Sequence, residues 1–260
     1  MSIPKVIHYC WFGHDPKPKL AEKCIKSWKK KCPDYKIIEW NEDNFDLSAC
    51  PLYVRQAYEA KKWAFVTDYV RLKVVYDHGG IYMDTDVELK KSLDPLLTHQ
   101  AYFGFEDGVH IATGLGFGAE KGNEVVRCML SDYDNAQFFQ ADGSILYVTC
   151  PARNTTSIQH LLDTGENRNG IVSIPGAVIY PTEFFCPLNW KTRELSITDN
   201  TYSIHWYDAS WLKEDQEILD RYLHFRGKVE KILGRKLGNF SARTIYSVCY
   251  PQKWNRIKKM

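Results

Sequence analysis

Asp84 and Asp86 stand two positions apart at the end of an apolar run, in the stretch GGIYMDTDVEL at residues 79–89. Residues two apart on an extended segment point to the same side. Two carboxylates so close repel each other unless a cation, a proton or a donor-rich ligand compensates their charge. Such oxygen ligands suit Mg²⁺ or Mn²⁺, which keep coordination positions open for waters and substrate phosphates. The triplet therefore predicts a metal site that a nucleoside diphosphate completes.

Two other interpretations of the triplet stay open. In aspartate-nucleophile phosphatases a strand is followed by D-x-D-x-T, and the first carboxylate attacks phosphorus. Here the fifth position is Glu88, and the strand follows two apparent βα units instead of lying near the chain start. A D-x-D triplet also occurs by chance in many proteins and often marks only a solvated turn. A non-catalytic carbohydrate-binding or scaffold protein is the second alternative function.

Asp68 and Arg71 precede the triplet, three positions apart in the stretch AFVTDYVRLKVVYDHGG, so they share one face of a predicted helix. The flanks of this helix are strongly apolar, and we expect it to be largely buried. A buried carboxylate and guanidinium require polar partners, which a sugar hydroxyl or a phosphate would supply. The pair is therefore a second candidate for ligand binding.

The elements that position these residues alternate between strands and helices. The pattern predicts strands at residues 5–12 and 35–40 with a helix near 20–30 between them, then a helix from about 53 to 77 that ends at Gly79 and Gly80. Further strands are predicted at 81–84, 101–105, 114–119, 170–175 and 202–207. This is an α/β pattern with a mixed central sheet, in which ligands bind at the carboxyl ends of strands. The Gly-rich segment 114–123 matches neither phosphate-loop pattern and is predicted to be sheet and turn beside the ligand.

Composition indicates a globular protein with one large domain and an appendage. The chain has 260 residues, of which 44% are hydrophobic, enough for a full core. We expect no secretory signal and no membrane span. The eight cysteines show no metal-binding spacing, so we expect reduced thiols and a cytoplasmic location.

Charge is distributed unevenly along the chain. Residues 221–260 contain eleven Lys or Arg and one acid, Glu230, a net charge of +10 in a chain whose total is +2. Apolar residues at helical spacing predict a basic amphipathic helix there. It would pack on the body or contact anionic lipid at the inner face of the cell membrane, as a peripheral contact. A nucleic-acid partner is not expected, because no nucleic-acid-binding motif accompanies the charge.

Three motifs together resemble glycosyltransferase family 32, and they are also similar to the catalytic domains of the large clostridial glucosylating toxins. The motifs are IPKVIHYCWFG at residues 3–13, the spacing A-x-x-x-D-x-x-R followed by H-G-G-I-Y-x-D-x-D at 64–86, and IHWYDASW at 204–211. The resemblance covers about residues 3–211. It implies a GT-A-like nucleotide-sugar-binding fold in residues 1–212, followed by a C-terminal helical basic extension, 213–260.

The resemblance also implies roles for individual residues. Trp11 matches the aromatic that stacks on the donor's base, and Asp68 and Arg71 match the pair that holds the transferred sugar and its phosphate. Asp84 matches the residue that touches donor ribose and sugar hydroxyls. The remaining matches are the metal ligands Asp86 and His205, and Ser210 and Trp211 of the closing segment that reaches the metal and the departing diphosphate. One position departs from the family, because Cys150 in VTCPARNT replaces the glycine of a T-G-P segment.

The implied activity is metal-dependent transfer of a sugar from a nucleoside diphosphate donor, expected to be UDP-linked, with Mn²⁺ or Mg²⁺ as cofactor. The resemblance further implies retention of anomeric configuration, a saccharide or lipid-linked saccharide acceptor, and a role in bacterial surface polysaccharide synthesis.

Overall fold

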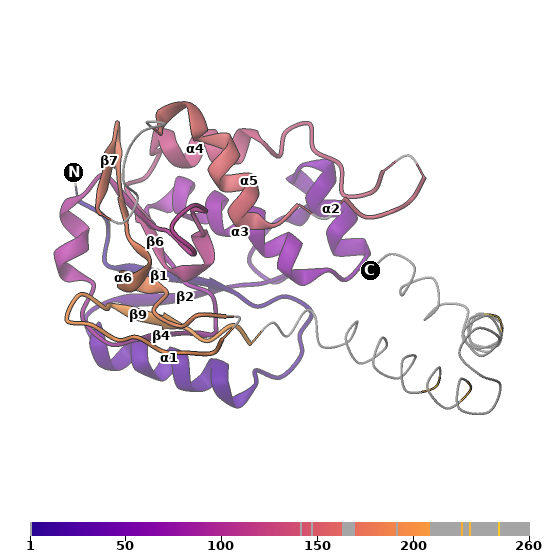
Figure 1. The fold of residues 1–260 in the computed structure, drawn as a ribbon. Coiled ribbons are helices and arrows are strands. Elements are labelled where there is room, and N and C mark those ends of the chain that lie inside the picture. The colour runs from indigo at the N-terminus through magenta and orange to yellow at the C-terminus, as the bar shows by residue number, and fades with distance from the viewer. Residues whose placement is uncertain are drawn as a thin grey trace. The chain divides into compact units, whose positions relative to one another are not determined.

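The structure is a computed structural model that describes residues 2–140, 142–146, 148–162, 170–190 and 192–208, together with Phe225, Val229 and Thr244 (Figure 1). The strands are β1 (Val6–Cys10), β2 (Lys36–Trp40), β3 (Gly80–Tyr82), β4 (Val87–Leu89), β5 (Ala101–Gly104), β6 (Phe117–Ala119), β7 (Val172–Ile174), β8 (Ala177–Tyr180) and β9 (Ser203–His205). The α-helices are α1 (Lys19–Lys31), α2 (Leu52–Glu59), α3 (Trp63–His78), α4 (Glu124–Ser131), α5 (Cys150–Ser157) and α6 (Thr182–Phe185). Short 3₁₀ helices are η1 (Leu47–Ala49), η2 (Asp94–Thr98), η3 (Thr113–Leu115) and η4 (Gln159–Leu161).

Seven strands form one mixed sheet in the order β2-β1-β3-β6-β5-β8-β7, while β4 and β9 pair in a separate antiparallel ribbon. The pairs β1·β2, β1·β3 and β5·β8 are parallel, and the other three pairs of the large sheet are antiparallel. This architecture confirms the predicted mixed α/β class with a GT-A-like fold.

Both faces of β1 are covered, which explains why its sequence is apolar nearly throughout. Ile7 and Tyr9 point into a core cluster with Cys24 and Trp28 of α1. On the opposite face, His8 Nδ1 accepts a hydrogen bond from Trp40 at 3.0 Å, so Nε2 carries the proton and donates to the carbonyl of Gly79 at 2.9 Å. His8 thereby joins β1 to the end of α3, where the chain turns into β3.

The turn from α3 into β3 requires glycine. Gly79 and Gly80 have φ angles of 66° and 112°, in a region that L-residues rarely adopt. A Cβ atom on Gly80 would lie 2.8 Å from the carbonyl oxygen of Val6 and 2.9 Å from His8 Nε2. This close approach places β3 beside β1 and directs the chain toward Asp84.

The predicted helix over 53–77 is two helices, α2 and α3. Lys61 adopts a positive φ of 55°, and the chain turns through Lys62 before α3 begins. Apolar periodicity runs through both helices, so the interruption comes from a backbone conformation that the pattern does not encode. The strands β4 and β8 were not predicted either.

The remaining expectations concern the domain boundary, the C-terminal extension and membrane spans. Contacts divide the chain into two compact units, of which the first comprises Met1–Gln140 and Leu146–Tyr207, and the second Ala141–Ile145 and Asp208–Met260. The predicted boundary between residues 212 and 213 lies outside the described residues and stays a prediction. Of the predicted extension, the structure describes Phe225, Val229 and Thr244, each in helical conformation. None of the helices in the described part of the chain is long and apolar enough to cross a bilayer.

Candidate active site

The two aspartates of the D-x-D triplet lie in a tight turn between β3 and β4, at the carboxyl end of β3. The sequence prediction placed them on an extended segment, but the N–H of Val87 donates to the carbonyl of Asp84 at 3.0 Å and closes a turn. Asp84 N–H also donates to the carbonyl of Gly114 at 3.1 Å, which ties the turn to η3. The turn still brings the two carboxylates close together, although it is not the extended segment that the sequence predicted.

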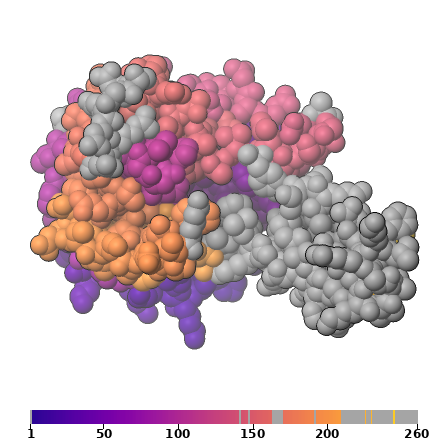
Figure 2. All heavy atoms as spheres, viewed as in Figure 1, coloured from indigo at the N-terminus to yellow at the C-terminus, as the bar shows by residue number. Residues whose placement is uncertain are grey.

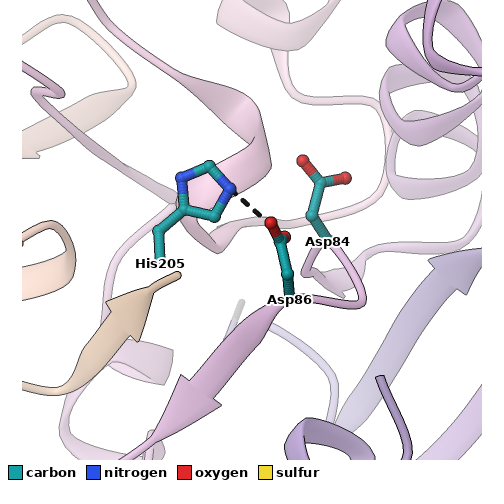
Figure 3. A group of neighbouring side chains, drawn as sticks. All are labelled: Asp84, Asp86 and His205. Carbon is teal, nitrogen blue, oxygen red and sulfur yellow. Dashed lines mark ion pairs between the residues drawn. The ribbon is translucent and has the colours of Figure 1, made fainter. Parts of the chain in front are cut away.

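Asp84, Asp86 and His205 face one another across this turn (Figure 3). One possible ligand atom from each lies within 4.8 Å of the others, and His205 Nε2 is 3.2 Å from Asp86 Oδ1. All three side chains are partly buried. Two carboxylate oxygens and an imidazole nitrogen form a donor set that fits a divalent ion such as Mn²⁺. Within the described ranges, this is the group of residues that could hold a metal ion.

The electrostatics of the turn also favour a cation. Burial raises the pKa of Asp84, and the neighbouring Asp86 carboxylate raises it further, although Arg71 opposes this. Burial acts to lower the pKa of His205, but the Asp86 carboxylate outweighs it and the pKa is raised. Both shifts reflect an excess of negative charge in a site shielded from water, which a bound cation would relieve.

Asp68 and Arg71 share one face of α3 and reach the same turn. Arg71 Nη2 lies 3.2 Å from Asp68 Oδ1 and 3.2 Å from Asp84 Oδ1, and the guanidinium is almost fully buried. Thr67 holds it from behind, accepting from Arg71 Nε at its carbonyl and from Nη2 at its hydroxyl. Burial raises the pKa of Asp68 to about 6, with Arg71 acting in the opposite direction. The structure thus brings Asp68, Arg71 and Asp84 into one ion-pair network.

Two residues of this network were not predicted. The hydroxyl of Tyr82 donates to Asp84 Oδ1 at 2.9 Å, and the Tyr82 ring lies under the Arg71 guanidinium at 5.1 Å. The sequence contained a signal for this contact, since Tyr82 stands two positions before Asp84 and residues two apart on a strand point to the same side. Gly114 is the second residue, because a Cβ atom there would collide with the Asp84 carboxylate and come within 3.2 Å of Arg71 Nη1. The Gly-rich segment 114–123 forms turn and strand, as predicted, and its Gly114 lies beside the D-x-D turn.

Cys150 begins α5 and packs against the same guanidinium. Its sulfur lies 3.6 Å from Arg71 Nη1, 3.3 Å from Thr113 Oγ1 and 3.2 Å from Asn154 Nδ2. Burial raises the pKa of the thiol to about 12, so it is a neutral polar neighbour and not a nucleophile. The side chain that replaces glycine here therefore fills space behind Arg71.

Glu88 and Trp206 fasten the β4·β9 ribbon that brings His205 to the turn. Glu88 Oε2 accepts from Trp206 Nε1 at 3.0 Å and from Lys23 Nζ of α1 at 2.8 Å. The backbone N–H of Trp206 donates to the carbonyl of Asp86 at 3.0 Å. The fifth position of the triplet motif is thus a structural carboxylate, whose charged neighbours keep its pKa lowered despite partial burial.

Trp11 follows β1 at the same edge of the sheet as Asp84. Its Nε1 donates to the carbonyl of Asp15 at 2.6 Å, and Lys17 Nζ lies 5.6 Å from the ring centroid. The ring is partly exposed, so an aromatic face is available at the edge where the D-x-D turn lies. Ser210 and Trp211, the other predicted site residues, lie outside the described residues.

Comparisons with known proteins agree with this geometry. Residues 18–103 match the sequence model of the family described as "Glycosyltransferase sugar-binding region containing DXD motif". "Inositol phosphoceramide mannosyltransferase 3" of Schizosaccharomyces pombe is 32% identical over 109 residues, which are 39% of this chain and 29% of that protein. "Uncharacterized glycosyltransferase L373" of Acanthamoeba polyphaga mimivirus is 31% identical over 104 residues, 36% of this chain and 40% of that protein.

The fold is also similar to a solved structure. "PaToxG Glycosyltransferase" superposes with a TM-score of 0.50 at 20% identity, covering 61% of this chain and 69% of that one. The aligned part spans less than half the length of the two curated relatives. The matched segment, residues 18–103, contains α1, α3 and the D-x-D turn, whereas Trp11 and His205 lie outside it. Residues 18–103 of this chain are thus similar to glycosyltransferase sugar-binding regions that contain a DXD motif.

Proposed function

We propose that this protein is a glycosyltransferase that moves a sugar from a nucleoside diphosphate donor, UDP-linked in the first instance, to a saccharide acceptor. The observation that carries the proposal is the convergence of Asp84, Asp86 and His205 within 4.8 Å, beside the buried Asp68–Arg71 pair. A cation-binding turn next to a guanidinium suits a ligand that combines a diphosphate with sugar hydroxyls.

In this proposal each residue has a role set by its contacts. Asp86 and His205, with Asp84, would hold Mn²⁺ or Mg²⁺. A bound ion acts there as a Lewis acid that stabilises charge on the departing diphosphate. Arg71, held by Asp68 and Asp84, directs its remaining N–H groups to the donor's phosphate.

The sugar side of the site rests on carboxylates. Asp68 is ionised at neutral pH, because its pKa is raised only to about 6, and it accepts hydrogen bonds from sugar hydroxyls. Tyr82 keeps Asp84 oriented toward the ligand through its hydroxyl. Trp11 offers a flat face to the donor's base, and Ser210 and Trp211 are proposed to close over the diphosphate. Such preorganised charge would stabilise an oxocarbenium-like transition state.

The acceptor and setting belong to the same proposal. The names of several relatives specify mannosyl transfer to a phosphoinositol ceramide, a lipid-borne acceptor. Their names support a lipid-linked acceptor here and place mannose nucleotides among the donors to test. We propose retention of anomeric configuration and a role in surface polysaccharide assembly at the cytoplasmic face of a bacterial membrane. The basic residues of 213–260 are proposed as a peripheral membrane contact.

The experiment measures release of nucleoside diphosphate from a panel of UDP- and GDP-sugars, with and without Mn²⁺. We expect release that depends on the ion and on one or a few donors. Asp86→Asn should abolish it, because it removes a charged ligand, while the fold stays intact. Asp34→Asn is the matched control, since Asp34 is an exposed aspartate that precedes β2, at the edge of the sheet opposite to the D-x-D turn. Full activity in Asp86→Asn would contradict the metal assignment.

The same preparation separates the two alternatives. An aspartate-nucleophile phosphatase would release phosphate from simple esters without a sugar nucleotide, through an acid-labile phosphoenzyme at Asp84. A non-catalytic carbohydrate-binding protein would bind sugar with no turnover of any donor. Either result would replace the glycosyltransferase proposal.

A further inference from the structure

Helix α1 has one buried face and one strongly basic face. Ala21, Cys24 and Trp28 are buried against the sheet and the β4·β9 ribbon. Lys19, Lys23, Lys26 and Lys30 recur at intervals of four, three and four, so they form one exposed stripe. The basic face of α1 is defined here as Lys19, Lys23, Lys26, Lys29 and Lys30. The acid in the helix is Glu22.

Among the described residues, most of these lysines form no ion pair. Lys23 pairs with Glu88 at 2.8 Å. For Lys19, Lys26, Lys29 and Lys30, the described part of the chain places no carboxylate within ion-pair distance. Like charges at i,i+4 repel each other and destabilise a helix. The stripe is therefore a feature that an anionic surface would stabilise.

The basic face continues into a loop with exposed apolar side chains, the 188–197 segment, of which the structure describes all residues but 191. Lys23 Nζ lies 5.0 Å from the Trp206 ring, and Arg193 Nη2 donates to the carbonyl of Trp206 at 3.1 Å. Arg193 belongs to the 188–197 segment, which an antiparallel bridge between Leu188 and Leu195 closes into a loop. Three of its large apolar side chains are exposed, Trp190 at 55%, Leu195 at 41% and Ile197 at 52%, whereas Leu188 is buried.

The basic face of α1 and the 188–197 segment therefore both contact Trp206, the residue next to the candidate metal ligand His205. The connection on the other side is equally short, since Trp28 of α1 donates from Nε1 to the carbonyl of Val87 at 2.7 Å. Figure 1 shows α1 alongside β4 and β9, and in Figure 2 indigo side chains of this part of the chain project from the lower edge. Whatever binds α1 is held at a set distance from the D-x-D turn.

We propose that the basic face of α1 and the 188–197 segment form a docking surface for an anionic lipid bilayer. Each Lys or Arg near such a surface is attracted to the anionic headgroups, and Trp and aliphatic side chains insert at the headgroup level. Through Trp28 and Trp206, docking holds the D-x-D turn at the level of the headgroups. In that position the D-x-D turn would meet a lipid-linked acceptor, and only this consequence rests on the proposed function.

The test is flotation of the full chain with phosphatidylcholine vesicles that either contain or lack phosphatidylserine. We expect binding that requires phosphatidylserine and weakens as salt rises. The triple variant Lys19→Glu, Lys26→Glu and Lys30→Glu should lower the partition coefficient at least about tenfold. Trp190→Ser should lower it by a smaller factor, about two- to fivefold, and less steeply with salt. Lys23 is left intact because it pairs with Glu88.

The matched control is the triple variant Arg55→Glu, Lys61→Glu and Lys121→Glu. It changes the net charge by the same amount, at exposed positions outside α1. Residues 209–260 remain in every variant, so a contribution of the basic C-terminal part is constant. Thermal melts establish that both triple variants are folded. Unchanged binding of the α1 variant, an equal loss in the control, or equal binding to neutral vesicles would overturn the proposal. So would α1-dependent binding to RNA without binding to vesicles. None of these readouts requires glycosyl transfer, so they fail or succeed separately from the proposed function.

Discussion

Val87 of β4 lies directly opposite His205 of β9, although the two residues come from distant parts of the chain. Because Asp86 immediately precedes Val87, this pairing brings Asp86 Oδ1 to 3.2 Å from His205 Nε2. A slip of one residue would turn His205 to the other face of the ribbon. The candidate metal site therefore depends on the register of two three-residue strands, which side-chain contacts must stabilise.

Glu88 should be one of the residues that maintain this register. Replacing Glu88 with Ala removes the acceptor for Trp206 Nε1 and for Lys23 Nζ, two side-chain contacts that link β4 to the end of β9 and to α1. Loss of such outer contacts weakens metal binding about tenfold or more in known sites. We expect a Mn²⁺ dissociation constant about tenfold higher, measured by titration calorimetry or by the EPR signal of free Mn²⁺.

The control for Glu88 is Glu124→Ala. Glu124 pairs with Arg127 on α4, its side chain is 69% exposed, and its loss should leave Mn²⁺ affinity unchanged. If Glu88→Ala bound Mn²⁺ as tightly as the parent, the register would not depend on this carboxylate.

Tyr82 and Tyr102 are both buried, so replacing each with Phe compares the loss of a hydroxyl that contacts Asp84 with the loss of one that does not. Tyr82→Phe removes the donor to Asp84 Oδ1, and a hydrogen bond to a charged group contributes about 1.5–3 kcal/mol. We expect kcat/KM for the donor to fall about tenfold or more. Tyr102 OH is buried and has no hydrogen-bond partner among the described residues, so Tyr102→Phe should be neutral or stabilising. Steady-state kinetics and urea unfolding of both variants check the contrast, and equal effects would argue against a role for Tyr82 at Asp84.

His8 should make the fold sensitive to acid. Burial lowers its pKa to about 4, against about 6.5 when unfolded. Between these values the unfolded state binds more protons, so the stability contributed by neutral His8 is complete above pH 6.5 and is lost as the pH falls toward 4. The shift corresponds to about 3 kcal/mol.

The measurement compares the free energy of unfolding of the parent and of His8→Gln at pH 7 and at pH 4.5. Glutamine keeps an N–H donor and a carbonyl acceptor but does not titrate. The raised pKa of Asp68 acts with the opposite sign in this range, yet it cancels in the difference between the two proteins. We expect the free energy of unfolding of the parent, relative to that of His8→Gln, to be about 2–3 kcal/mol smaller at pH 4.5 than at pH 7. A difference that is the same at both pH values would contradict a buried neutral imidazole.

The described cysteines should differ in their reaction with iodoacetamide. Burial raises the pKa of Cys24 and Cys150 to about 12, so at pH 8 only about one in ten thousand of these thiols is ionised. Cys128 is partly exposed on α4. Mass spectrometry of the native protein should find Cys128 modified while the two buried thiols stay unmodified, and all three should react in urea. Rapid modification of native Cys150 would indicate that the space behind Arg71 opens to solvent.

Local sequence signals predicted the elements that carry most of the candidate site. The spacing of apolar residues predicted α1, and the apolar runs predicted β1, β2 and β3 within a few residues. Asp68 and Arg71 were predicted on one helical face, because spacing within a helix is a local property. The division between α2 and α3 was missed, since it depends on the positive φ of Lys61.

The sequence by itself determined which chemical groups are present and which of them are neighbours along one element: the D-x-D carboxylates after β3, and the Asp68–Arg71 pair on α3. The tertiary structure decided that His205 meets Asp86, that Cys150 backs Arg71, and that Gly114 gives Asp84 its space. These contacts join segments far apart in the chain. They depend on strand register and on the packing of whole elements, whereas periodicity reports only the local conformation and burial of a single element.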